Sequence, residues 1–126
     1  MAVSEAFHVF VLDQLSQIRP IRSHRMFGGV GYYSGRLFFA IAADDTLYFK
    51  TDKTTCPMFQ EHGMRPFRPF GADTRPMPYF EVPAHLFENS EELGAWMQHA
   101  IAVAAAARDP AARAVIRIKR KPAAGR

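Results

Sequence analysis

Residues 26–51 read MFGGVGYYSGRLFFAIAADDTLYFKT, and this stretch concentrates the aromatic residues, the glycines and the alternating pattern of the chain. It contains three runs rich in β-branched and aromatic residues, at 26–33, 36–43 and 47–51. Ser34-Gly35 separates the first two runs, and Asp44-Asp45 separates the last two. Neither connection is long enough for a crossover helix, so we predict three strands that run antiparallel to their neighbours.

The length of the second turn decides which side chains share a face of the sheet. A loop of two aspartates places the alanines of the middle run, Ala40 and Ala42, beside Leu47 and Phe49. A three-residue loop that includes Thr46 places larger side chains there instead, namely Leu37, Phe39 and Ile41. Burying one such side chain is worth roughly 1.5–3 kcal/mol, so we predict the three-residue loop. Tyr48 and Lys50 then point to the wetter face.

The three glycines of GGVG, at positions 28, 29 and 31, invite comparison with a phosphate-binding loop. A dinucleotide-binding loop needs G-x-G-x-x-G between a strand and a helix, whereas this segment leads into another strand. We therefore interpret the glycines as a bulge or bend that requires positive φ or close approach of the backbone.

Helices are predicted before, within and after the strands. Residues 4–18 have an amphipathic pattern with Ser4 as N-cap, and a short helix is predicted over 55–62. The last helix runs from Asn89 or Ser90 to about residue 108. Its predicted apolar stripe consists of Leu93, Trp96, Met97, Ala100, Ile101 and Ala104.

Two further strands are predicted between the second and third helices. Residues 65–70 contain Pro66 and Pro69, which cannot donate to a ladder, so this strand is expected at an edge of the sheet. Residues 77–82 alternate regularly, with Phe80 and Val82 on one face.

Composition limits the class of protein. The chain has 126 residues, of which 48% are hydrophobic, so it can bury a substantial core without disulfides or metal. It has a single cysteine, Cys56, which excludes an internal disulfide. No apolar run approaches the roughly 18 residues that span a bilayer, and the N-terminus lacks the features of a secretory signal. We expect a cytoplasmic protein without a membrane partner.

Charge divides the chain into two parts. Residues 1–109, the expected folded domain, hold ten Lys and Arg against twelve Asp and Glu, a balance of −2. Residues 110–126 hold six basic residues and no acidic ones, and form the expected basic C-terminal tail. The alternatives for this tail are a disordered segment, a docked strand or helix, and an arm that binds phosphates. The candidate nucleic-acid contacts are Arg113, Arg117, Lys119, Arg120 and Lys121.

The residue pattern contains no recognisable catalytic or metal-binding motif. The histidines at 8, 24, 62, 85 and 99 are isolated, and none belongs to a metal-ligand motif. Asp44-Asp45 is explained by turn chemistry. We therefore predict no catalytic, metal or cofactor residues. A sheet that binds RNA through stacking remains an alternative, with Tyr32 or Tyr33, Tyr48 and Tyr79 beside Lys50.

Four segments in this order and spacing carry a family resemblance: 25–33 (RMFGGVGYY), 35–40 (GRLFFA), 45–50 (DTLYFK) and 79–83 (YFEVP). Together they closely resemble the N-terminal domain of TfoX, the bacterial regulator of natural competence. The resemblance extends over roughly residues 20–105.

This resemblance implies a two-layer α+β fold, ordered α-β(3)-α-β(2)-α, with an antiparallel five-stranded sheet similar to that of type III secretion chaperones. The element order matches the order read from the residues. The resemblance also implies a role in DNA transformation and transcription regulation, and it transfers no catalytic or cofactor residue. The C-terminal half of TfoX, which resembles a nucleic-acid-binding module, is not matched. We therefore expect a protein-interaction module, with another protein or a second copy as partner.

Overall fold

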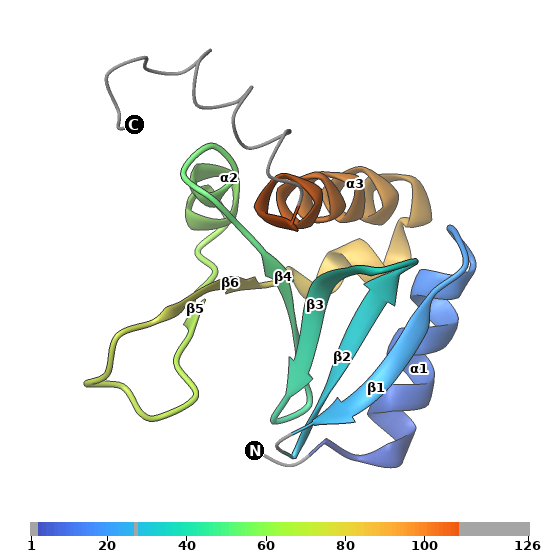
Figure 1. The fold of residues 1–126 in the computed structure, drawn as a ribbon, viewed down its shortest axis with the longest axis horizontal. Helices are drawn as coiled ribbons and strands as arrows, with labels where there is room; N and C mark the ends of the chain where they lie inside the picture. Colours follow the sequence, from blue (N-terminus) through green and yellow to red (C-terminus); the bar gives the residue numbers. More distant parts are fainter. Residues whose placement is uncertain (1–2, 27, 109–126) are drawn as a thin grey trace.

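The computed structural model describes residues 3–26 and 28–108, which form a sheet with helices (Figure 1). The elements in chain order are α1 (Glu5–Ser16), β1 (Arg22–Met26), β2 (Gly29–Ser34), β3 (Leu37–Ala43), β4 (Thr46–Lys50), α2 (Cys56–Glu61), β5 (Pro66–Phe67), β6 (Met77–Glu81), the 3-10 helix η1 (Ala84–Glu88) and α3 (Ser90–Arg108).

The strands form one antiparallel sheet in the order β1-β2-β3-β4-β6-β5. The α+β class is confirmed, and the short strand β5 lies at an edge as predicted. The sheet has six strands rather than five. The additional strand is β1, because the predicted run 26–33 starts inside a hairpin in which Met26 pairs with Gly29.

The predicted three-residue loop between β3 and β4 is wrong. Ala43 pairs with Thr46, so Asp44 and Asp45 alone form the loop. Both aspartates have left-handed backbones, with φ of 50° and 52°. This is the geometry of a two-residue turn whose twist suits a hairpin, and aspartate is among the few side chains that tolerate it. Ile41 consequently lies on the wetter face rather than beside the core residues of β4.

Phe39 is nevertheless fully buried on the face predicted for it. A bulge explains this result. Tyr32 pairs with Ala40 and Tyr33 pairs with Phe38, so Phe39 is an extra residue without a partner on β2. The bulge lets Phe39 and Ala40 both face the helices. The Phe39 ring packs 5.9 Å from the Phe49 ring, measured between centroids.

The core lies between one face of the sheet and the helices (Figure 1). Val11 and Leu15 of α1 and Phe59 of α2 contribute to it. All six residues of the predicted α3 stripe are buried in the same cluster. The fold therefore has two layers, the sheet and the helices. The opposite face of the sheet does not belong to this core.

The start of α3 depends on one cap. The Asn89 side chain accepts a hydrogen bond from the backbone N–H of Glu92 at 3.1 Å. We expect Asn89→Ala to lower the free energy of unfolding by about 0.5–2 kcal/mol, because that donor loses its partner. Urea denaturation measures the change, with His99→Ala on the exposed side of α3 as control. Equal stability of the two variants would contradict the assigned cap.

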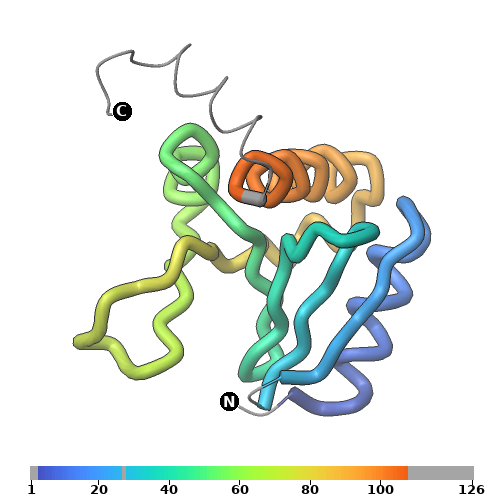
Figure 2. The backbone as a smooth tube through the Cα atoms, viewed as in Figure 1, coloured from blue at the N-terminus to red at the C-terminus, as the bar shows by residue number. Residues whose placement is uncertain are grey.

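The connection between β5 and β6, residues 68–76, leaves the body of the molecule as an arm (Figure 2). Phe70 in this arm is 83% exposed, and Met77 at the start of β6 is 40% exposed. These are two of the large apolar side chains that the described part of the chain leaves exposed.

Candidate functional site

The sheet face turned away from the helices, which we call the open face, is the candidate functional site. Strand pairing places matching side chains of neighbouring strands on it. Its side chains are Arg22, His24, Met26, Tyr33, Phe38, Ile41, Tyr48, Lys50, Tyr79 and Glu81. A second apolar cluster forms here around Phe67 and Tyr79, and no described helix contributes a residue to it.

Aromatic rings on the open face pack against one another across the strands. The Tyr33 and Phe38 rings are stacked, with centroids 5.0 Å apart, and the Phe38 and Tyr79 centroids are 6.2 Å apart. A cation stands beside each end of this row. The Arg22 guanidinium carbon lies 4.7 Å from the Tyr33 centroid, and the Lys50 amine lies 4.9 Å from the Tyr79 centroid. Both contacts have cation–π geometry.

Gly31 makes room for this row. A Cβ at this position would lie 2.8 Å from Cε1 of Phe38 and 2.9 Å from Cε of Met26. Gly29 has a different neighbour, because its Cβ would lie 2.7 Å from the backbone oxygen of Ala42. Close approach of the backbone, as predicted for these glycines, is found at Gly29. At Gly31 the close neighbours are side chains, and the missing Cβ lets side chains of the open face lie flat on the sheet.

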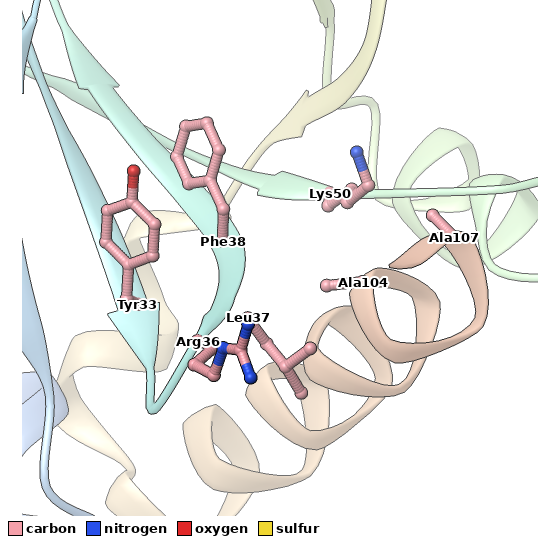
Figure 3. Close-up of a pocket in the computed structure, with 7 residues that line it drawn as sticks. All are labelled: Tyr33, Arg36, Leu37, Phe38, Lys50, Ala104 and Ala107. Carbon is pink, nitrogen blue, oxygen red and sulfur yellow. The ribbon is translucent and has the colours of Figure 1, made fainter. Parts of the chain in front are cut away.

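A shallow hollow of about 380 Å³ lies where one end of the open face meets the last turns of α3 (Figure 3). The β2–β3 hairpin, the end of β4 and the last turns of α3 form its wall. The residues that line it are Tyr33, Arg36, Leu37, Phe38, Lys50, Ala104 and Ala107. The lining combines apolar and aromatic groups with two cations and contains no carboxylate, histidine or cysteine.

Lys50 has an unusual environment in this hollow. Burial lowers the pKa of its amine below the ordinary value, because desolvation disfavours the charged form. Its nearest polar partner is the Tyr79 hydroxyl at 3.5 Å. Burial also raises the pKa of Tyr79 to about 12, so this hydroxyl remains neutral at physiological pH and gives Lys50 no counter-charge. Among the described side chains, neither Lys50 nor Arg36 forms an ion pair.

The alternative of a base-stacking platform finds little support in this arrangement. Tyr32 lies on the helix-covered face, where its hydroxyl is 3.0 Å from Nδ1 of His8. Tyr79 is 3% exposed. Because β1 and β3 flank β2, Arg22 and Phe38 contact the Tyr33 ring from opposite sides. Stacking on single-stranded nucleic acid requires free ring faces, which this row does not offer.

Of the remaining polar residues singled out in the sequence, two histidines lie side by side, and the cysteine lies elsewhere. His62 stacks on His85 with ring centroids 6.0 Å apart and meets the edge of Trp96. The Cys56 thiol has the Thr51 hydroxyl as its nearest partner, at 3.9 Å. Within residues 3–26 and 28–108, no three His, Cys, Asp or Glu side chains are grouped so that they could hold a metal ion.

Arginines of residues 19–25 also contact separate groups. Arg19 donates to Gln98 at 2.7 Å, and Arg25 pairs with Glu5 of α1. The tail residues Arg113, Arg117, Lys119, Arg120 and Lys121 lie outside the described residues, so they remain a prediction.

Sequence reasoning placed Tyr48 and Lys50 on the wetter face correctly but did not identify the hollow. Arg36 and Phe38 were missed as members of it. Strand parity indicated only that Phe38 faces away from Phe39. The hollow also needs α3, whose contribution no local pattern indicates.

Comparison of the sequence with models of protein families shows to which family the chain belongs. The model of the TfoX N-terminal domain matches residues 13–104. The chain belongs to the TfoX N-terminal domain family. The match includes every strand and all of the open face, so the resemblance read from the four sequence segments is confirmed. A search of curated proteins finds no match.

Within the described residues, no helix combines the length and the apolar character needed to cross a bilayer.

Proposed function

We propose that this chain is a non-enzymatic TfoX-like regulatory domain that acts through protein contacts in the cytoplasm, in the control of competence or related gene expression. The open face is the contact surface. The observation that carries the proposal is the row of aromatic side chains on the sheet face opposite the main core, beside a second apolar cluster to which no described helix contributes a residue.

Protein contact fits this surface better than nucleic-acid contact. The faces of the aromatic rings contact one another and Arg22, so they are not free to stack on nucleotide bases. The ring edges and the neighbouring side chains are what a partner protein would contact. Residues 1–109 have a balance of −2, which provides no general attraction for phosphates. Phe70 in the adjacent arm supplies an exposed apolar anchor of the kind that is enriched at protein interfaces.

Capture from the native cytosol under mild crosslinking tests the proposal. The bait is the full chain, and the comparison uses Tyr48→Asp on the open face and Val9→Asp on the exposed side of α1. We expect a stoichiometric partner, or a second copy of the chain, that the open-face variant loses and the α1 variant keeps. Recovery of no stoichiometric partner would contradict the proposal.

A second candidate function is nucleic-acid binding by the tail, which holds six basic residues and no acidic ones in residues 110–126. If Arg113, Arg117, Lys119, Arg120 and Lys121 all contact phosphates, the logarithm of affinity should fall with the logarithm of salt concentration with a slope of about −4 to −5. Fluorescence anisotropy with labelled duplex DNA measures this slope. Deletion of residues 110–126 should abolish the binding, and unchanged affinity would exclude this candidate.

A further inference from the structure

The hollow beside Lys50 is the feature of the open face whose chemistry is most specific. Leu37 and the buried Ala104 form apolar parts of its lining, and Phe38 adds a ring. Figure 3 shows Arg36 and Lys50 on different sides of the hollow. The two charges therefore flank an apolar surface.

We propose that this hollow binds an acidic protein segment in which carboxylates flank an apolar side chain. The apolar side chain occupies the space over Leu37 and Ala104, and the carboxylates pair with Lys50 and Arg36. The inference rests on the proposed function and names the chemistry of the partner.

The half-buried Lys50 amine favours an acidic partner, because part of its hydration is lost in the hollow. A desolvated ammonium without a carboxylate is unfavourable, and an incoming carboxylate offsets that cost through a charge-assisted hydrogen bond. Arg36 is exposed and has no hydrogen-bond partner among the described residues, so its fork-shaped donor group is available.

The shape of the hollow favours a segment of a protein over a free small molecule. Sites for small ligands bury most of the ligand surface, which a shallow hollow does not do. A side chain that enters with the rest of a partner gains further contact along Tyr33 and Phe38. Electrostatic complementarity at the hollow would then select the partner and fix its register.

Lys50 and Arg36 could instead serve only to stabilise the fold, and this alternative predicts a different experimental result. Ala104 and Ala107 belong to the last turns of α3, where the helix carries partial negative charge. If Lys50 and Arg36 serve only to complement this charge, their removal lowers stability and leaves peptide binding unchanged.

Fluorescence anisotropy of the full chain with labelled probes tests the inference. The probes are a short peptide with phenylalanine flanked by aspartates and glutamates, the same peptide with serine in place of phenylalanine, a lysine-containing counterpart, and oligothymidylate. We expect only the first peptide to bind well. Lys50→Met and Arg36→Met should each weaken it about tenfold, the effect of losing one hydrogen bond to a charged group. Arg75→Met, in the arm, removes the same charge away from the hollow and should have no effect.

The outcomes separate this inference from the proposed function. No binding of the acidic peptide, or equal binding to the Met variants, overturns the inference; a cytosolic partner that still depends on Tyr48 would leave the proposed function intact. Preference for oligothymidylate that is lost in Lys50→Met and Arg36→Met overturns both. Arg36 is exposed, so Arg36→Met should fold. This variant therefore keeps the test decisive even if Lys50→Met fails to fold.

Discussion

Phe39→Ala is expected to lower the free energy of unfolding by about 3–5 kcal/mol, which urea denaturation measures. The side chain is 0% exposed and packs against Phe49 between the sheet and the helices. Truncation removes buried apolar surface and leaves a cavity that the bulged backbone cannot close. The loss is a large part of the stability of a domain of this size.

Phe38→Ala is the matched control for this prediction, because it removes the same ring from the neighbouring residue on the opposite face. Phe38 is half-buried and belongs to the open face. We expect a smaller loss of stability together with a weaker interaction with the captured partner. A greater loss of stability for Phe38→Ala than for Phe39→Ala would contradict the assigned bulge.

Gly29→Ala is expected to lower the free energy of unfolding through a steric cost of about 1–3 kcal/mol, the usual cost of forcing extra volume into a packed site. The added Cβ would lie 2.7 Å from the backbone oxygen of Ala42, and a backbone atom within a sheet cannot move aside as a side chain can. Replacing glycine by alanine also restricts the unfolded chain, which favours folding by about 0.4–1 kcal/mol. We expect the steric cost to exceed this gain.

Gly94→Ala provides the control for the same chemical change. Gly94 lies in α3, and its Cβ would meet Ile18 at 3.5 Å, an ordinary contact distance. Alanine is the better helix former by about 1 kcal/mol, so this variant should be more stable than the parent. Chemical denaturation of both variants shows the sign of each effect. Stabilisation by Gly29→Ala would exclude the close approach of β2 and β3.

Local signals were sufficient to predict most of the elements. The cap of α3, its apolar stripe and the edge position of β5 all followed from residue patterns. The register of the β3–β4 hairpin did not, because two departures from regular pairing act together. Asp44 and Asp45 both adopt the left-handed conformation, and a bulge then returns Phe39 to the core. The prediction correctly assumed that the larger side chain, Phe39, is buried. It assumed wrongly that β3 is a regular strand without a bulge.

Strand β1 and the hollow were missed for different reasons. β1 reads RSHRM, which carries no apolar alternation because it lies at the edge of the sheet. Charged side chains are common on edge strands, where they discourage pairing with other chains. The hollow combines Arg36, Lys50 and Ala104 from distant parts of the sequence, and only the packing of α3 on the sheet brings them together.

The most direct test of the open face as the contact surface is site-specific photocrosslinking. Benzoylphenylalanine replaces Tyr33 on the open face in one variant and Phe10 on the exposed side of α1 in another, so each substitution exchanges one ring for another. After irradiation in the native cytosol, we predict one adduct of discrete mass from position 33 and none from position 10. Adducts from position 10 alone, or from neither position, would contradict the account.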